Sequence, residues 1–240
     1  YKQSKAYVEE LNGFILELEW DIVDIRDFQY KNLEMKEEKI AEFFYEKFAD
    51  TPIFMRMQRI AEYLIDQQET LSGKTMPEEE QQNVFEKINR MYETIDLLTL
   101  YNRFLKQSGR KGMNTADHIL RYEDVYPMLY LKYCCFGLPA RRPLRHLVID
   151  EMQDYSYLQY VLLAKMFDCP MTILGDKGQT MQEEKQDVLS FLPKIFGKDV
   201  CRIYLEKSYR STSEIMDYAS EIAGEKQNMG IGRHGSLPQT

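Results

Sequence analysis

The sequence lacks the features of a membrane-spanning or secreted protein. It contains no apolar run of the roughly 18 residues that a transmembrane helix requires, and no signal peptide is visible. The four cysteines and three histidines have no metal-ligand spacing, so we expect reduced core cysteines and no zinc site. These absences predict a soluble, cytoplasmic chain without a membrane partner, and 44% hydrophobic residues suffice for one or two cores.

Also missing, upstream of residue 118, is a glycine-rich loop that could cradle nucleotide phosphates. Such a loop follows a strand and presents backbone N–H groups and a lysine to the phosphate oxygens. Residues 72–75 end like one, but Gln68 stands where the first glycine belongs, and the preceding residues have the pattern of a helix. We interpret residues 72–75 as a turn between helices.

Residues 147–156 carry the most information, because a short apolar run is followed directly by a dense group of acids. Residues 147–149 have the composition of a buried strand, and Asp150, Glu151 and Asp154 crowd its carboxyl end. Open α/β sheets bind ligands beyond the carboxyl ends of their strands, where carboxylates can hold a metal ion and polarise a water molecule. The pattern is typical of a Walker B site.

Two more apolar runs follow, each ending in a polar loop and each succeeded by a helix-like stretch. Residues 171–174 lead into the glycine-bearing loop 175–180, and residues 202–205 lead into residues 206–211. Strands alternating with helices predict an α/β fold with a parallel sheet and crossover helices. We therefore expect all three loops to meet at one edge of that sheet.

The three loops resemble motifs II, III and IV of UvrD/Rep-type superfamily 1 helicases in content, order and spacing. The matching segments are residues 150–154, 175–179 and 208–211, within a resemblance that covers about residues 118 to 215. The HelD-like (helicase IV-like) subgroup is the most similar, because residues 122–125 open a helix before the acidic strand and motif III lacks the usual aromatic. The resemblance implies a partial RecA-like sheet with flanking helices, and ATP and Mg²⁺ as cofactors.

The resemblance also implies a catalytic role for particular residues. Asp150 would hold Mg²⁺, and Glu151 would orient or deprotonate the water that attacks the γ-phosphate. Gln179 would sense that phosphate. Arg210 would stabilise the charge that develops on the transferred group, because its fixed fork of donors suits phosphate oxygens.

Two further residues would bind the nucleotide: Gln153 near the γ-phosphate and Tyr209 against the adenine. Each motif alone also has a simpler interpretation, since acids at a strand end can be solvated and Ser211 or Ser213 could cap a helix beginning near Glu214. The occurrence of three motifs in one order favours the nucleotide site.

DNA is the macromolecular partner that the resemblance implies, but one DNA-binding feature is missing. Residues 181–187, which follow motif III, contain three acids and no aromatic side chain that could stack on bases. Carboxylates there would repel a phosphate backbone. The sequence thus favours ATP hydrolysis by the parent protein more strongly than it favours strand unwinding.

The first half of the chain has mainly helical patterns. Periodicity and helix-terminus signals predict a strand-like region at 14–25, a second candidate strand at 28–33, and then helices at 36–48, 53–68, 77–93 and 94–106. Trp20, the single tryptophan, is expected in the core. A glycine-rich, basic break at residues 108–112 ends this region.

These patterns predict three parts. Residues 1–115 form a helical insertion (arm) module, residues 116–224 a partial RecA-like motor domain 1A, and residues 225–240 a flexible link toward a second motor domain. With no phosphate loop and no second lobe, the chain is interpreted as a fragment that is inactive alone, whereas the full-length parent hydrolyses ATP.

Charge is spread unevenly between the two halves. Residues 1–117 hold 23 acids against 16 Lys and Arg, a net charge of −7, whereas residues 118–240 have a net charge of −1. In HelD-like proteins such an arm contacts RNA polymerase, so the acidic arm could dock there, or it could simply be solvated. The basic group Arg141, Arg142 and Arg145 is interpreted as surface.

Overall fold

The chain divides into two compact units in a computed structural model that describes residues 1–114, 120–138, 144–176, 188–197, 200–205, 207–223, 229–230 and 232–238. The helical unit comprises residues 1–147 and 156–170. The motif unit comprises residues 148–155 and 171–240. No helix in the described ranges is both long enough and apolar enough to cross a membrane.

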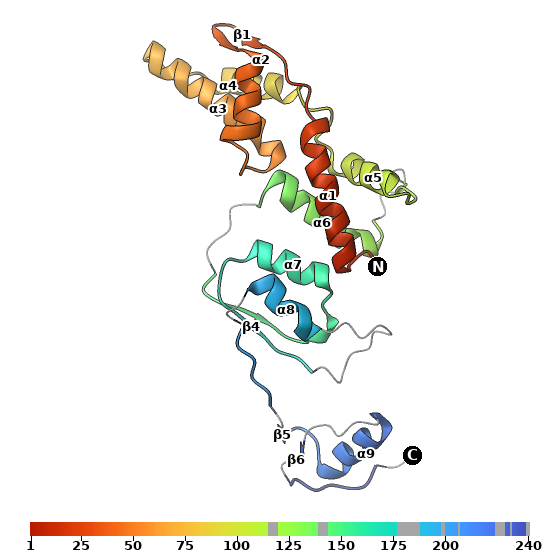
Figure 1. Ribbon diagram of the computed structural model, residues 1–240. Helices are drawn as coiled ribbons and strands as arrows, with labels where there is room; N and C mark the ends of the chain where they lie inside the picture. The colour runs from red at the N-terminus through yellow and green to blue at the C-terminus, as the bar shows by residue number, and fades with distance from the viewer. Residues whose placement is uncertain are drawn as a thin grey trace. The chain divides into compact units, whose positions relative to one another are not determined.

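The helical unit is built almost entirely from helices, with one small β-hairpin (Figure 1). Its elements in chain order are α1 (Lys5–Asp21), β1 (Phe28–Tyr30), β2 (Leu33–Met35), α2 (Glu37–Glu42), a π-helical turn (Phe43–Lys47), α3 (Ile53–Ser72), α4 (Glu78–Asn89), α5 (Leu97–Gln107), α6 (Tyr122–Phe136) and α7 (Tyr157–Met166). The four helices predicted between residues 36 and 106 are confirmed, with ends shifted by a few residues.

Helix α3 shows why these predictions succeed. Its buried residues Met57, Ile60 and Leu64 recur at helical spacing and form one apolar face. Gly73 ends the helix with φ of +67°, a left-handed conformation that glycine adopts without steric cost. Ser72 is the last residue of α3, and residues 73–75 begin the turn toward α4, so the predicted turn between helices is confirmed with its start one residue later.

The strand predicted at residues 14–25 is wrong, because this segment belongs largely to helix α1. The Ser4 side chain caps the helix by accepting a hydrogen bond from the Tyr7 N–H. The side chains of Tyr7, Leu11, Phe14 and Leu18 are buried at a spacing of three to four residues, which only a helix can place on one face. The aromatic and aliphatic residues that suggested a strand are thus the core face of a helix.

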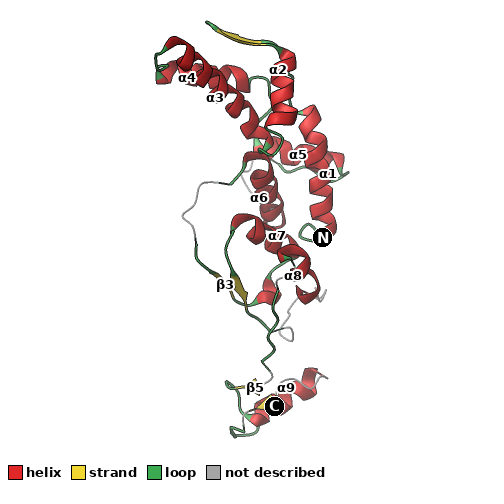
Figure 2. Cartoon of the chain, turned by 60° about the vertical axis from the view of Figure 1, so that its left-hand side comes forward, coloured by secondary structure: helices red, strands yellow, loops and turns green. Residues whose placement is uncertain are grey.

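Helix α6 is at the centre of the helical unit, in contact with α1, α3, α5 and α7 (Figures 1 and 2). Its buried Asp124 accepts hydrogen bonds from the Tyr101 hydroxyl and the Lys2 ammonium, each at 2.6 Å. Tyr7 joins this network through its hydroxyl, 3.0 Å from that of Tyr101. Burial of the phenol and its hydrogen bond to Asp124 raise the pKa of Tyr101. This network joins the amino-terminal residues, α1 and α5 to the start of α6.

The motif unit contains the short parallel strands. Strand β3 (Leu147–Ile149) pairs with β4 (Met171–Ile173), and β5 (Lys207–Ser208) pairs in parallel with β6 (Met229–Gly230). Its helices are α8 (Val188–Phe196) and α9 (Ser213–Ala223). Together with the antiparallel hairpin β1–β2 and the helical unit, these elements confirm the predicted α/β class, with a mainly helical first part that includes a small β element.

The third strand of the predicted sheet, residues 202–205, is wrong in the described structure. These residues have no strand partner among the described residues, and Ile203 and Leu205 are 82% and 80% exposed. A β-strand needs neighbouring N–H and C=O groups for its ladder, and here the pairing begins only at Lys207. Residues 200–205 are instead irregular backbone.

The predicted burial of Trp20 and of the cysteines is wrong for most of these side chains. Trp20 is 67% exposed and therefore not a core residue, because it lies on the face of α1 opposite the buried residues. None of the cysteines forms a disulfide, as expected, but only Cys135 is buried and Cys201 is exposed. Burial raises the pKa of the Cys135 thiol to about 12, which makes it unreactive.

The two compact units of the structure do not coincide with the three predicted domains. The compact units are defined by contacts, and helix α6 packs on α1, α3 and α5 while α7 packs on α6 and α1. The boundary predicted at residue 115 concerns where an insertion joins the chain, so it remains a prediction.

Candidate functional site

The described residues that follow β3 and β4 lie side by side, which brings residues 150–153 next to residues 174–176. The Leu174 N–H donates to the Ile149 carbonyl at 2.8 Å, and the Leu174 carbonyl accepts from the Met152 N–H at 2.8 Å. Bonds from one residue to two positions on its neighbour are the slanted pattern of parallel strands. Residues 150–153 and 174–176 therefore leave the sheet at the same edge, as predicted for the first two of the three loops, whereas β5 belongs to a separate two-stranded sheet with β6.

Asp150 and Glu151 present their carboxylates to solvent at this edge. Glu151 has φ of +52°, in the left-handed region that non-glycine residues seldom adopt, and its N–H donates to Asp150 Oδ1 at 2.9 Å. Backbone strain of this kind costs about 1–3 kcal/mol and is concentrated at functional sites. A Mg²⁺ ion and a water molecule could reach both carboxylates.

Gln153 links the two motifs, and this role was not anticipated from the sequence. Its side chain is buried, with Nε2 donating to Glu151 Oε2 at 2.7 Å and Oε1 accepting from the Asp176 N–H at 3.1 Å. Both ends of the amide are therefore engaged. Gln153 fixes the orientation of the Glu151 carboxylate relative to the loop after β4.

Gly175 allows this close approach because it has no side chain. A Cβ atom at this position would lie 2.4 Å from Met152 Cγ and 2.6 Å from both Gln153 Oε1 and the Met152 nitrogen. Two of these atoms are fixed by the Gln153 and Leu174 hydrogen bonds. Any larger residue must push the two loops apart.

Gly175→Ala is therefore expected to destabilise the motif unit by about 1–3 kcal/mol, the usual cost of overpacking. Amide hydrogen exchange at Met152 and Leu174 measures the effect, because both N–H groups bond across this contact. Gly13→Ala is the matched control, since nothing lies within 4 Å of a Cβ there and alanine favours a helix interior. Unchanged exchange at Met152 and Leu174 in Gly175→Ala would contradict the close-approach interpretation.

Motif IV is not joined to this link by any described contact. Tyr209, 70% exposed, and Arg210, also exposed, lie between β5 and α9. Arg210 makes no ion pair with Asp150 or Glu151 among the described residues. Gln179 lies outside the described residues.

A glutamate near motif IV was missed by the sequence interpretation. Glu214 accepts a hydrogen bond from the Gly235 N–H at 2.9 Å and lies 2.9 Å from His234 Nδ1. Backbone hydrogen bonds, with His234 contributing, lower the pKa of Glu214 to about 2. The first turn of α9 thus holds residues 234–235 beside motif IV. Glu214 and residues 234–235 are about 20 residues apart, and no sequence pattern indicates that they are in contact.

Metal ligands in this part of the molecule are few. No group of three or more His, Cys, Asp or Glu side chains in the described ranges could hold a metal ion. A Mg²⁺ ion, however, usually keeps several waters and takes only one or two carboxylates together with substrate phosphates. Asp150 fits that arrangement, in which most ligands come from nucleotide and water, while Glu151 remains free to contact the attacking water.

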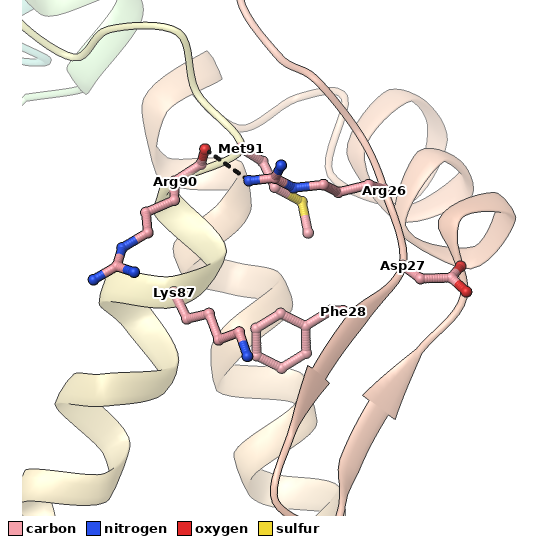
Figure 3. A pocket seen from close by; sticks show the side chains of 6 residues that line it. All are labelled: Arg26, Asp27, Phe28, Lys87, Arg90 and Met91. Atoms are coloured by element: carbon pink, nitrogen blue, oxygen red, sulfur yellow. Dashed lines mark hydrogen bonds between the residues drawn. The ribbon is translucent and has the colours of Figure 1, made fainter.

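The recess in Figure 3 is a weaker candidate. It has a volume of about 180 Å³ and lies between β1 and α4, with Arg26, Lys87 and Arg90 among its lining residues. Lys87 and Arg90 stand at the carboxyl end of α4, where cations offset the helix dipole, and Arg26 donates to the Arg90 carbonyl at 3.5 Å. Helix capping therefore explains these cations without a ligand.

Known proteins provide a partial match. No protein-family model matches the chain. It is 29% identical over 96 residues to the ATP-dependent DNA helicase UvrD1 of Mycobacterium leprae (strain TN), which covers 34% of this chain and 12% of that protein. It is 30% identical over 93 residues to the ATP-dependent DNA helicase srs2 of Schizosaccharomyces pombe, which covers 36% of this chain and 10% of that protein. The matches span about a tenth of each helicase, and they support a relation of this chain to UvrD/Rep-type superfamily 1 helicases.

Proposed function

We propose that this chain is part of an ATP-dependent DNA helicase-type motor and supplies its Mg²⁺-binding and water-activating carboxylates. The observation that carries the proposal is the hydrogen-bonded link from Glu151 through Gln153 to the Asp176 N–H. It joins two motifs that are 23 residues apart at the carboxyl ends of paired strands, where α/β sheets bind ligands.

In this mechanism Asp150 would hold Mg²⁺, and the ion would neutralise negative charge on the ATP phosphates. Glu151 accepts a proton from, or orients, the water that attacks the γ-phosphate. Because Gln153 Nε2 holds Oε2 of Glu151, the other carboxylate oxygen remains available to that water. A carboxylate held in this way needs little reorganisation during the reaction.

The remaining motif residues have proposed roles that require further contacts. Arg210 would stabilise the transferred phosphoryl group, Tyr209 would stack on adenine, and Gln179 would sense the γ-phosphate. The exposure of Tyr209 and Arg210 leaves both side chains available to a nucleotide. A phosphate-binding loop would have to precede this chain in the complete motor, so we propose that residues 1–240 alone do not hydrolyse ATP.

Asp150→Asn tests the metal site. In a polypeptide that extends this chain at its amino terminus to include a phosphate-binding loop, we expect Mg²⁺-dependent ATP hydrolysis. The substitution removes the negative charge that attracts the ion, so the Mg²⁺ concentration for half-maximal rate should rise about tenfold or more. An unchanged Mg²⁺ dependence would remove Asp150 from the metal site.

The organisation of the longer protein is likewise a proposal. Residues 1–115 would be an insertion in motor domain 1A, residues 116–224 part of that domain, and residues 225–240 a link toward a second motor domain. A HelD-like protein with this arrangement could remodel a protein–nucleic acid complex without unwinding DNA. The acidic arm, with its net charge of −7, favours docking on a basic surface, of which RNA polymerase is one candidate.

A further inference from the structure

The solvent face of helix α1 carries an apolar stripe that no described residue covers. Leu16 and Trp20 are 66% and 67% exposed, and they are one helical turn apart. Gly13 lies on the same face and has nothing within 4 Å of where its Cβ would be. A glycine inside a helix costs about 1 kcal/mol relative to alanine. The helix backbone at Gly13 is therefore open to solvent beside two large exposed side chains.

The Trp20 indole is held in place instead of moving freely in solvent. It stacks on the Tyr45 ring with the centroids 4.8 Å apart and an interplanar angle of 14°. Tyr45 in turn makes an edge contact with the buried Phe44 at 5.0 Å. An exposed indole fixed in this way on the half-buried Tyr45 ring loses little conformational entropy when a partner covers it.

The buried Arg56 side chain connects α1, which carries Trp20, to the π-helical turn, which carries Tyr45. Arg56 NH1 contacts Glu19 Oε1 at 2.6 Å and donates to the Phe44 carbonyl at 3.1 Å. Glu19 precedes Trp20 in α1, and Phe44 precedes Tyr45 in the π-helical turn. Leu16, Trp20 and Tyr45, together called the Trp20 platform, therefore form a preorganised surface.

Acidic residues adjoin the Trp20 platform in the sequence. Glu17 and Asp21 follow Leu16 and Trp20 directly in α1, and Glu46 follows Tyr45; all three are exposed, and Asp21 also pairs with Arg103 at 3.3 Å. Carboxylates at the rim repel nucleic-acid phosphates, and they also repel the same face of a second copy of this chain. They attract a segment that carries Lys or Arg beside its own apolar residues.

We propose that the Trp20 platform docks a basic amphipathic helix of a partner protein. Apolar residues of that helix cover Leu16 and Trp20, the helix backbone approaches α1 at Gly13, and its cations pair with Glu17 and Glu46. Arg or Lys side chains also gain a cation–π contact with the indole face. This interaction is independent of the nucleotide site.

Intrinsic fluorescence tests the proposal directly, because Trp20 is the single tryptophan of the chain. The full chain is titrated with a helical peptide of Leu and Lys, with a matched peptide of Leu and Glu, and with single-stranded DNA. We expect a saturable blue shift with the Leu/Lys peptide alone, and weaker binding as salt is raised. A shift with DNA, with the acidic peptide, or on concentrating the chain by itself would overturn the proposal.

Variants are compared by the anisotropy of a labelled Leu/Lys peptide. Trp20→Ala should weaken binding by about tenfold or more, as for a central aromatic anchor, and Glu17→Lys should weaken it several-fold. Leu71→Ala is the apolar control because Leu71 is 78% exposed on another helix, and Glu86→Lys is the charge control on α4. Equal affinities for Trp20→Ala and Leu71→Ala would show that the peptide binds elsewhere.

Discussion

Glu151→Gln is expected to abolish ATP turnover by the complete motor, with a loss of about 10²–10⁴-fold in kcat, the usual contribution of a general base. The amide cannot accept a proton at neutral pH. Its oxygen can still accept the Gln153 Nε2 hydrogen bond, so the link to the loop after β4 survives. ATP affinity should therefore change by no more than a few-fold. Single-turnover hydrolysis and equilibrium ATP binding measure the two effects separately.

Asp154→Asn is the matched control for this substitution. Asp154 is an exposed acid in the same motif, three residues along the chain, and it makes no ion pair with a described residue. Its loss should change kcat less than twofold. Turnover of Glu151→Gln at the rate of Asp154→Asn would remove Glu151 from catalysis.

Arg56→Ala is expected to produce the largest loss of stability in the helical unit. The guanidinium is buried and contacts four acceptors: Glu19 Oε1 at 2.6 Å, and the carbonyls of Ala49 at 2.7 Å, Thr51 at 2.9 Å and Phe44 at 3.1 Å. Removing one partner of a buried ion pair costs about 3–5 kcal/mol. The three carbonyls also lose their donor. The free energy of unfolding from urea denaturation should fall by about that amount.

Arg59→Ala separates this effect from a general effect of arginine on helix α3. Arg59 is three residues along the same helix, with its side chain 51% exposed and paired with Glu62 at 3.0 Å. Exposed pairs of this kind contribute about 0–1 kcal/mol. If both variants unfold at the same urea concentration, the buried Arg56 network does not stabilise the fold as proposed.

Helices with one apolar face and clear ends were predictable from the sequence. Pro77 followed by three glutamates marks the start of α4, because proline fits the first turn and acids favour the positive end of the dipole. Helix α1 was not predictable in the same way, since its exposed Leu16 and Trp20 extend the apolar pattern round the helix and obscure its periodicity. Tryptophan side chains are usually buried, and the sequence alone gives no sign that Trp20 is exposed on the surface of α1, where its indole stacks on Tyr45.

The sequence predicted that two strand ends meet at the candidate site. It did not predict the side-chain hydrogen bonds of Gln153 that connect them. Neighbouring parallel strands end at the same edge of a sheet, so the meeting of motifs II and III follows from two apolar runs. The Gln153 bridge depends on one side-chain conformation and on the space that Gly175 leaves, neither of which the sequence specifies. Apolar composition alone predicted a strand at 202–205, but a strand also requires a partner.

Glu151, Gln153 and the residues after β4 are proposed to form one side of a nucleotide site. Amide NMR of the phosphate-loop-containing polypeptide, titrated with Mg²⁺ and a non-hydrolysable ATP analogue, tests this claim most directly. We predict that the amide resonances of Asp150, Glu151, Gly175 and Asp176 shift together with one binding constant. Shifts confined to other residues, with these four amides unchanged in the nucleotide-bound state, would contradict the account.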